Sequence, residues 1–322
     1  MTFTVVLLDL TTPERAAQLR RFLPPGFEFM HGTARGDDHL KEIIRNADFA
    51  ISGQVGVSGE VLKAARQLKL LHKWGVGVDN IDTRTAKSLG IMVARTTGSN
   101  AVPVAEFAIG LMLATLRFQA LGHERLRQGT WMAFSQMPGE TFCISAKTVG
   151  LIGFGAIGQA VARRLAGFDC RILYNKRTPL PAAEETKLGV TYASTNDILA
   201  NADIVSLHCP LTPETTGLID KRALGRMKRT AVLINVARGG VVVEADLAQA
   251  LRGRTIRGAA MDVFSIEPLP ADSELLGLDN IVVTPHLAAA TADTFEPTLQ
   301  RMFDNMVRVT RGEPIPATDL VV

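Results

Sequence analysis

The chain of 322 residues is 47% hydrophobic and carries a formal net charge of +3. This length and apolar content suffice for two domains, each with its own hydrophobic core. The small charge, spread without a long basic run, argues against binding to nucleic acid or to a membrane surface. The sequence contains no uninterrupted apolar stretch of about 18 residues, so no transmembrane helix is predicted.

Short apolar runs alternate with helical patterns over the first third of the chain. Strands are predicted at 4–8, 49–51, 68–71 and 91–94, and helices at 13–22 and 59–65. Alternation of this kind is typical of a parallel sheet covered by helices. The N-terminal segment lacks the basic region and the small-residue cleavage site of a signal peptide, and we expect it to form a first strand.

The three cysteines, Cys143, Cys170 and Cys209, stand far apart and form no C-x-x-C pair. We expect them to be small buried side chains in a reducing compartment, neither disulfide-bonded nor ligands of a metal. Together with the N-terminal pattern they predict a cytoplasmic protein. No other cluster of side chains has the spacing of metal ligands, so we expect no metal site.

The middle of the chain begins with a helical run at 104–116 that is apolar on nearly all sides. Such a helix is expected to be buried between domains or between subunits. The following segment, 128–140, contains Trp131, Phe134 and Met137. It is interpreted in two ways, as an arm that faces a second subunit or as a lid over a local core, and the sequence favours neither.

The most informative stretch is T-V-G-L-I-G-F-G-A-I-G, which ends in three spaced glycines and leads into an amphipathic helical pattern. Gly153 would make the tight turn after the strand, Gly155 would let the backbone approach a pyrophosphate, and Gly158 would let the helix pack closely on the strand. The phosphates would then bind at the N-terminus of that helix. The stretch therefore predicts a dinucleotide-binding site.

The second half of the chain repeats the alternation of strands and helices. Strands are predicted at 148–152, 171–174, 204–207, 231–235, 257–263 and 281–284. About six strands in this order fit a complete dinucleotide-binding sheet. One more helix is predicted at 291–310. Because a single helix cannot form a domain alone, we expect it to pack on the first domain, which then becomes discontinuous.

Five further motifs stand in a fixed order around the glycine stretch. They are K-W-G-V-G-V-D-N-I-D (73–82), H-C-P-L-T-P-E-T-T-G (208–217), N-V-A-R-G-G-V-V (235–242), A-M-D-V-F-S-I-E-P-L-P (260–270) and T-P-H-L-A-A-A-T (284–291). With the glycine stretch they resemble the D-isomer-specific 2-hydroxyacid dehydrogenase family over nearly the whole chain, and look most like its glyoxylate and hydroxypyruvate reductases.

The resemblance implies an α/β fold of two Rossmann-like, flavodoxin-like parallel-sheet domains with a cleft between them. The substrate domain would combine 1–98 with 288–322, and the dinucleotide-binding domain would span 99–287. By the same resemblance we expect a homodimer built mainly through the dinucleotide-binding domain.

The reduction of a 2-keto acid requires a hydride, a proton and a grip on the carboxylate. His286 is the best candidate proton donor, since histidine titrates near neutral pH and this one follows a predicted strand. Glu267 also follows a strand, and a neighbouring carboxylate raises the pKa of a histidine and fixes its orientation. The planar guanidinium of Arg238 suits a carboxylate. The resemblance implies that all three residues are catalytic.

The resemblance also implies the remaining contacts. The backbone N–H groups of Val76 and Gly77 would hold the substrate carboxylate, with Arg238. The cofactor-binding residues would be Gly153, Gly155, Ala156, Ile157, Gly158, Asn175, Lys176, Arg177, Thr178, Cys209, Pro210, Val236, Ala237, Asp262 and His286. Asp262 would hold the nicotinamide carboxamide, while Cys209 and Pro210 would form a wall beside the adenine and ribose. His208 follows a strand but is interpreted as part of that wall, not as catalytic.

The segment after the second strand of the cofactor domain departs from the pattern of NAD-using members. Those members carry an acidic residue there for the ribose 2′-hydroxyl, whereas this chain reads Asn175, Lys176, Arg177 and Thr178. Lysine and arginine attract a 2′-phosphate that a carboxylate would repel. The sequence therefore predicts a preference for NADP(H), with NAD as the alternative cofactor.

The substrate is expected to be a small unphosphorylated 2-keto or 2-hydroxy acid of D configuration, such as glyoxylate or hydroxypyruvate. The strand end Ile51-Ser52-Gly53-Gln54 supplies no fixed cation for a substrate phosphate, and we expect no added regulatory domain. Two alternatives stay open. One is an NAD-linked phosphoglycerate dehydrogenase, and the other is a non-catalytic nucleotide-sensing binding protein, like the transcriptional corepressors of the family.

Overall fold

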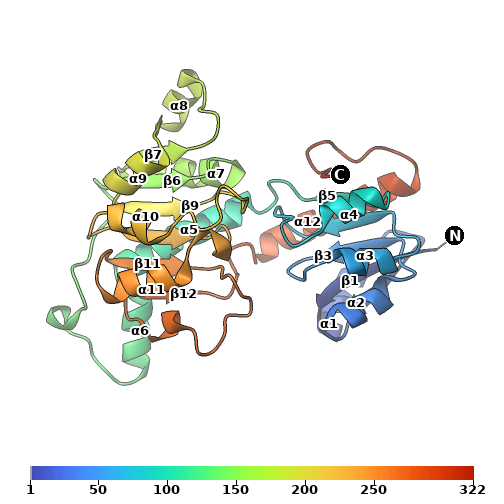
Figure 1. Cartoon of the computed structure of the whole chain (residues 1–322), viewed down its shortest axis with the longest axis horizontal. Coiled ribbons are helices and arrows are strands. Elements are labelled where there is room, and N and C mark those ends of the chain that lie inside the picture. Colours follow the sequence, from blue (N-terminus) through green and yellow to red (C-terminus); the bar gives the residue numbers. More distant parts are fainter. Residues whose placement is uncertain (1) are drawn as a thin grey trace. The chain divides into compact units, whose positions relative to one another are not determined.

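The computed structural model describes residues 2–322, which form two compact units (Figure 1). Unit 1 comprises the residues up to Asn100 together with Thr291–Val322, and unit 2 comprises Ala101–Ala290. Each unit has its own parallel sheet with hydrophobic residues packed on both faces. The predicted α/β class with two parallel sheets is therefore confirmed.

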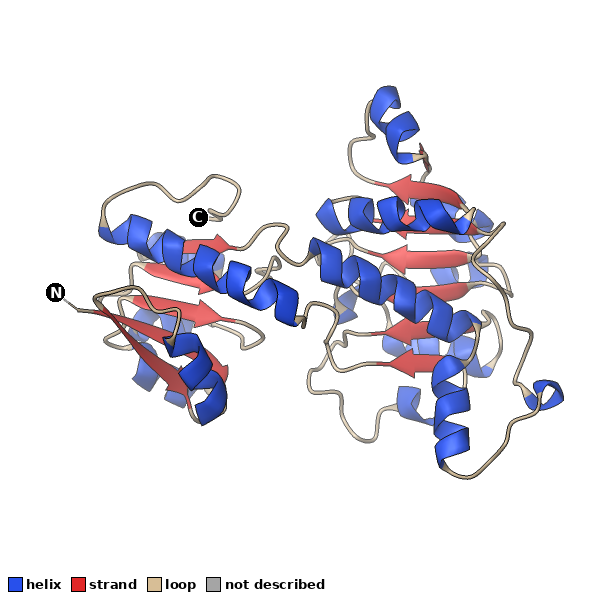
Figure 2. Cartoon of the chain, turned by 180° about the vertical axis from the view of Figure 1, so that it is seen from behind, coloured by secondary structure: helices blue, strands red, loops and turns tan. Residues whose placement is uncertain are grey.

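Unit 1 contains a five-stranded sheet in the order β2-β1-β3-β4-β5. Its strands are β1 (Phe3–Leu10), β2 (Phe27–Gly32), β3 (Phe49–Ser52), β4 (Leu70–Lys73) and β5 (Met92–Arg95). Its helices are α1 (Pro13–Arg20), α2 (Asp37–Ile44), α3 (Gly59–Ala64), α4 (Thr83–Ser88) and α12 (Ala292–Thr310). Buried side chains of α2, α3 and α4 cover one face of the sheet, and those of α1 and α12 cover the other. Figure 2 shows α12 lying across the strands.

Unit 2 contains a seven-stranded sheet in the order β12-β11-β10-β9-β6-β7-β8. Its strands are β6 (Thr148–Ile152), β7 (Arg171–Asn175), β8 (Val190–Tyr192), β9 (Ile204–Leu207), β10 (Val232–Asn235), β11 (Gly258–Met261) and β12 (Ile281–Val283). Its α-helices are α5 (Ala101–Leu116), α6 (Gln119–Arg127), α7 (Ala156–Leu165), α8 (Ala182–Leu188), α9 (Thr195–Asn201), α10 (Lys221–Arg226) and α11 (Glu244–Arg252), and its short 3-10 helices are Phe134–Gln136, Ala166–Phe168, Gly239–Val241 and Glu274–Gly277.

The strand order of unit 2 reverses between β6 and β9, which are hydrogen-bonded neighbours. The chain winds outward from β6 on one side and from β9 on the other, so this is a doubly wound dinucleotide-binding topology. In open sheets of this kind the ligand crevice lies at the carboxyl ends of the strands on either side of such a reversal. A site is therefore expected among the loops after β6, β7, β9, β10, β11 and β12.

Helix α5 is the predicted apolar helix, and its Val104, Ala108 and Met112 are buried. It packs beside α7 on the face of the sheet formed by β10, β11 and β12. Among the described residues no single helix is long and apolar enough to cross a membrane. The pair α5 and α6 passes the same test of length and composition together, but it is bent by 67°.

Two expectations differ from the structure. The sequence analysis did not predict β2 or β8, of which β8 is a three-residue strand at the sheet edge. The expectation that all three cysteines are buried is wrong for Cys143, which is exposed, while Cys170 is half-buried and Cys209 is buried. Cys143 lies in the irregular segment before β6, between Phe142 and Ile144, which pack on the core of unit 2 while its own side chain faces outward.

Candidate active site

The glycine loop connects β6 to α7. Gly153 has a φ of +95°, and a Cβ atom there would lie 2.4 Å from the backbone N of Cys209. A Cβ on Gly158 would lie 2.4 Å from the carbonyl oxygen of Gly153, so both positions require glycine. Gly155 differs, because no atom lies within 4 Å of its Cβ position. It leaves open space before α7, whose first N–H groups have no side-chain cap, and a pyrophosphate fits this arrangement.

His286 and Glu267 are hydrogen-bonded to each other on the loops that follow β12 and β11. Nδ1 of His286 lies 2.7 Å from Oε2 of Glu267, and the two side chains are 31% and 30% exposed. The other carboxylate oxygen, Oε1, accepts a hydrogen bond of 2.9 Å from the backbone N–H of Phe264. The carboxylate is thus fixed by its own loop, and it fixes the imidazole in turn.

The pKa of Glu267 lies below its ordinary value of 4.5 as the result of opposing causes. Burial raises this pKa, but the hydrogen bonds from His286 and from the backbone of Phe264, together with the positive charges of His286 and Arg238, outweigh burial. Glu267 is therefore a carboxylate near neutral pH, and it accepts the hydrogen bond that orients the imidazole of His286.

The backbone of His286 is left-handed, with a φ of +53°. A non-glycine residue in this conformation is uncommon, and the surrounding structure has to hold it there. The N–H of His286 donates to the carbonyl of Asp262 at 2.8 Å and to that of Thr284 at 3.0 Å. These two bonds fix the turn that directs the imidazole toward Glu267.

Asp262 is completely buried at the end of β11 and organises the same turn. Its carboxylate accepts hydrogen bonds from the hydroxyl of Thr284 at 2.7 Å and from the backbone N–H groups of Leu287 and Ala288, each at 2.9 Å. The residue predicted to contact the nicotinamide thus also anchors the turn that carries His286. The sequence analysis missed this second role and the part played by Thr284.

Arg238 lies in a turn after β10 that is built by Asn235. The buried amide of Asn235 donates to the carbonyl of Arg238 at 3.0 Å and accepts from the N–H of Ala237 at 3.0 Å. Gly239 follows, and a Cβ there would lie 1.9 Å from the backbone carbon of Phe264. The glycine thereby lets this turn approach the loop that carries Glu267. Asn235 was not predicted, although a buried asparagine at a strand end is a signal of such a turn.

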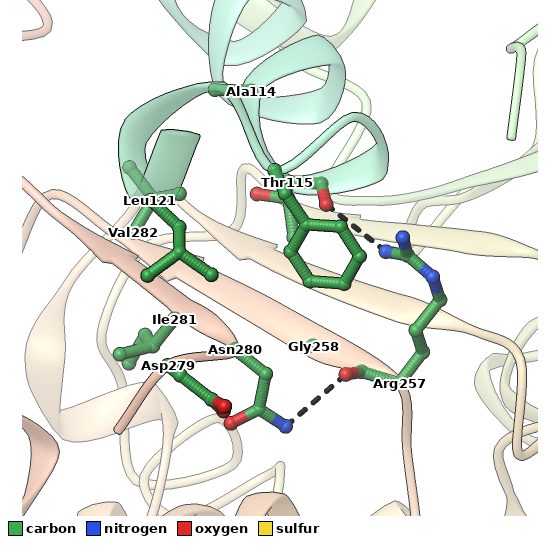
Figure 3. Close-up of a pocket in the computed structure, with 10 residues that line it drawn as sticks. Ala114, Thr115, Leu121, Arg257, Gly258, Asp279, Asn280, Ile281 and Val282 are labelled. Carbon is green, nitrogen blue, oxygen red and sulfur yellow. Dashed lines mark hydrogen bonds between the residues drawn. The ribbon is translucent and has the colours of Figure 1, made fainter. Parts of the chain in front are cut away.

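The structure brings the predicted residues of unit 2 to the carboxyl ends of the strands of its sheet. His286, Glu267 and Arg238 lie beyond β12, β11 and β10, and the glycine loop lies beyond β6 in the same parallel sheet. The small hollow drawn in Figure 3 lies at the opposite, amino ends of the strands, where β11 and β12 begin, and none of the predicted residues line it.

The residues after β7 form a basic, partly exposed turn. Arg177 and Thr178 are exposed, Lys176 is half-buried, and the side chain of Asn175 donates to the carbonyl of Ala193 at 2.9 Å. Arg177 lies close enough to Glu214 to contribute to the lowering of its pKa, after the hydrogen bonds from Thr212 and from its own backbone. The turn presents cations and no carboxylate of its own.

The segment after β9 contains two groups with strongly shifted pKa values. Burial lowers the pKa of His208 to about 4 and raises that of the Cys209 thiol to about 11. Near neutral pH both are uncharged, which does not suit His208 to proton transfer. Nε2 of His208 lies 2.9 Å from the hydroxyl of Ser206, and Pro210 is exposed beyond them.

Val76 and Gly77 belong to unit 1, in the loop after β4. Gly75 precedes them with a φ of +132°, which favours glycine. Its carbonyl accepts a hydrogen bond of 3.0 Å from the backbone N–H of Thr96, and its own N–H donates to the Thr96 hydroxyl at 3.2 Å. Among residues 2–322 the N–H groups of Val76 and Gly77 have no hydrogen-bond acceptor, as expected of amides that bind an anion.

The chain is similar to known proteins over most of its length. Residues 109–288 match the model of the D-isomer specific 2-hydroxyacid dehydrogenase NAD binding domain. The D-3-phosphoglycerate dehydrogenase of Mycobacterium bovis is 40% identical over 280 residues, which cover 87% of this chain and 52% of that protein. The chain thus spans about half the length of the first curated relatives it matches. The glyoxylate reductase of Korarchaeum cryptofilum is 40% identical over 261 residues, 81% of this chain and 78% of that protein.

A solved structure is also similar to this chain over its whole length. The NADPH-dependent glyoxylate/hydroxypyruvate reductase of Sinorhizobium meliloti, in complex with NADP and malonate, is 30% identical with a TM-score of 0.85, over 100% of this chain and 97% of that chain. The resemblance predicted from the motifs is therefore confirmed. The chain belongs to the D-isomer specific 2-hydroxyacid dehydrogenase family.

Proposed function

We propose that this chain is an oxidoreductase that transfers a hydride between NADP(H) and a small 2-keto or 2-hydroxy acid of D configuration, such as glyoxylate or hydroxypyruvate. The observation that carries the proposal is the hydrogen bond of 2.7 Å between His286 and Glu267, at the same ends of the strands as the glycine loop. A proton donor and a pyrophosphate cradle on one edge are what a nicotinamide-dependent reduction needs.

The proposed chemistry assigns proton transfer to His286. When bound, a reduced nicotinamide supplies the hydride that the keto carbon receives. Glu267 engages Nδ1 of the imidazole, so Nε2 is the nitrogen that donates a proton to the carbonyl oxygen in reduction and accepts it in oxidation. The carboxylate of Glu267 keeps the ring oriented through its bond to Nδ1. The left-handed backbone of His286 holds this orientation before a substrate binds.

We propose that the substrate carboxylate is bound by the guanidinium of Arg238 and by the N–H groups of Val76 and Gly77. A guanidinium offers two parallel donors to a carboxylate, and two successive amides offer a short anion-binding arc. The positive charge of Arg238 also suits the carbonyl oxygen as negative charge develops on it. In this proposal Ala156, Ile157, Val236 and Ala237 border the cofactor with their backbones, and Asp262 holds the carboxamide.

For the cofactor we propose NADP(H), with NAD as the alternative. The support is the basic turn of Lys176 and Arg177, together with the NADP-bound relative from Sinorhizobium meliloti. Replacing both residues by alanine should raise the KM for NADPH about 10-fold or more, as expected for lost charge-assisted hydrogen bonds, and change that for NADH little. Lys187→Ala, on the exposed end of α8, is the matched control. An equal effect on both cofactors would refute the preference.

A second candidate is an NAD-linked phosphoglycerate dehydrogenase, because the relative from Mycobacterium bovis with that name is 40% identical. Against it, the end of β3 at Ser52 and the following residues Gly53 and Gln54 include no cationic side chain for a phosphate. Steady-state rates with glyoxylate, hydroxypyruvate and 3-phosphoglycerate, each with both cofactors, decide between the two. Cofactor binding without turnover of any of the three would instead favour a nucleotide-sensing protein and overturn the proposal.

We also propose a homodimer in the cytoplasm. Trp131 and Phe134, in the segment after α6, are 80% and 78% exposed and do not cover a local core. Large aromatic side chains in such an exposed segment fit a contact with a second copy of the chain. The free cysteines fit a reducing compartment.

A further inference from the structure

The loop after β3 in unit 1 is fixed by the carboxylate of Asp9, which lies near the end of β1. Three successive backbone N–H groups donate to it, those of Gly53, Gln54 and Val55, the latter two at 2.7 and 2.9 Å. A carboxylate that accepts several amide bonds holds a loop firmly, because each bond is charge-assisted. Residues 53–55 therefore form a rigid support beside the end of β4, the next strand in the sheet.

The ammonium group of Lys73 bonds to this support. Lys73 is the last residue of β4 and is 6% exposed, and its Nζ donates to the carbonyl of Gly53 and, at 2.8 Å, to Oδ1 of Asn80. The amide of Asn80 also donates to the carbonyl of Val55 at 2.7 Å and to that of Gln54 at 3.3 Å. A buried ammonium is stable only with such partners, so its position is well determined.

These bonds close the loop that contains Val76 and Gly77. Lys73 stands at the beginning of the loop and Asn80 at its end, so their side-chain bond joins the two ends directly. Behind Asn80, the N–H of Val57 donates to the carbonyl of Asn80 at 2.8 Å, and Val57 pairs with Ile81 in an isolated β-bridge. Loop 74–79 is thereby attached to the loop after β3 at one end and to β4 at the other.

We propose that Lys73 and Asn80 are positioning residues that close loop 74–79 and so direct the N–H groups of Val76 and Gly77 at the substrate carboxylate. The inference rests on the proposed function and names the side chains that shape its anion-binding arc. It differs from a direct role of the Lys73 ammonium on the substrate, since that role would not require Asn80.

Kinetics of Lys73→Met and Asn80→Leu test the inference. Contacts to the carboxylate are made equally in the bound substrate and in the transition state, so their loss raises KM and leaves kcat nearly unchanged. Each variant should raise the KM for the keto acid, and the Ki of oxamate as a keto-acid mimic, about 10-fold. The double variant should be little worse than either single one, because both residues belong to the same hydrogen-bonded cluster that closes this loop.

Two controls make the result specific. Lys69→Met changes the same residue type just before β4, where Nζ of Lys69 bonds to Asp48 at 2.9 Å, and it should leave KM unchanged. The dissociation constant for NADPH, measured by fluorescence titration, should be the same in all variants. If Lys73→Met does not fold, Asn80→Leu carries the test, since it retains the ammonium.

The outcomes separate this inference from the function on which it rests. A wild-type chain that turns over no 2-keto acid overturns the proposed function and the positioning role with it. An active wild type with an unchanged KM in Asn80→Leu overturns the positioning role alone. A loss confined to kcat in Lys73→Met would assign the ammonium to the chemical step instead.

Discussion

At the scale of single residues, the candidate site depends on how little freedom His286 has. Its N–H is bonded to the carbonyls of Asp262 and Thr284, its Nδ1 to Glu267, and its backbone is held at a φ of +53°. A side chain fixed in this way loses little entropy when a substrate binds, which is what proton transfer in a defined direction requires.

Replacing His286 by asparagine tests its role with the least disturbance of the backbone, since asparagine tolerates a positive φ. We expect kcat to fall about 10²- to 10⁴-fold, the usual contribution of a general acid, with unchanged binding of NADPH. Stopped-flow turnover and fluorescence titration measure the two quantities. Activity within a factor of about two of the wild type would remove His286 from the mechanism.

The lowered pKa of Glu267 predicts a pH dependence of stability. Because the folded-state pKa lies below the ordinary value of 4.5, the bonds to the ionised carboxylate of Glu267 stabilise the fold above that value, and this effect is lost as the pH falls through the folded-state pKa. Urea unfolding from about pH 6 to about pH 3 should therefore show wild type and Glu267→Gln converging at the acid end. A difference that stayed constant over this range would contradict the cause assigned to the shift.

At the scale of elements, glycine determines which loops approach each other. Gly239→Ala places a Cβ 1.9 Å from the backbone of Phe264, so the turn of Arg238 and the loop of Glu267 have to separate. We expect a loss of unfolding free energy on the order of 3 kcal/mol and a strong loss of turnover. The neighbouring Gly240→Ala is the control, since its Cβ meets only the side chain of Leu211, whose Cδ atoms lie at 3.2 Å, and no backbone atom. Equal behaviour of the two variants would disprove the close approach.

Arg257 fixes the end of α5 at the amino ends of the strands, far from the site. It donates to the carbonyl of Thr115 at 3.0 Å (Figure 3). It also donates to the carbonyls of Leu116 at 3.0 Å and of Glu140 at 2.9 Å, and its guanidinium lies over the ring of Phe118 at 4.5 Å. Arg257→Met should lower the unfolding free energy by about 2 kcal/mol, without a change in the KM for the keto acid or for NADPH. Denaturant unfolding and steady-state kinetics check both parts, and a raised KM would show that the two edges are coupled.

Much of the element order could be predicted from the sequence, since buried strands of parallel sheets read as short apolar runs. The glycine stretch located β6 and α7, and the apolar run at 104–116 located α5. β8 could not be predicted, because it has three residues and an exposed Tyr192, and so lacks an alternating pattern. The pairing of His286 with Glu267 came from the family resemblance. The carboxylate bonds of Asp262 and the closure of loop 74–79 join distant residues and carry no local signal.

At the scale of the whole molecule, the exposed aromatic side chains predict the oligomeric state. Changing both Trp131 and Phe134 to serine should convert a dimer to a monomer in light scattering, since large apolar contacts dominate such interfaces. Tyr192→Ser, at a 39% exposed aromatic residue on β8, is the matched control and should leave the mass unchanged. A wild-type chain that is already monomeric would overturn the proposed dimer.

The left-handed backbone at position 286 has a consequence for how the family site can change over descent. Valine, isoleucine and threonine would be penalised there twice, by the lost imidazole and by their branched Cβ at a positive φ. Asparagine or glycine at this position would lose the imidazole but would add no backbone strain. A lineage that abandoned catalysis but retained this turn would therefore reach asparagine or glycine first, and either residue in a descendant would mark a fold kept for binding alone.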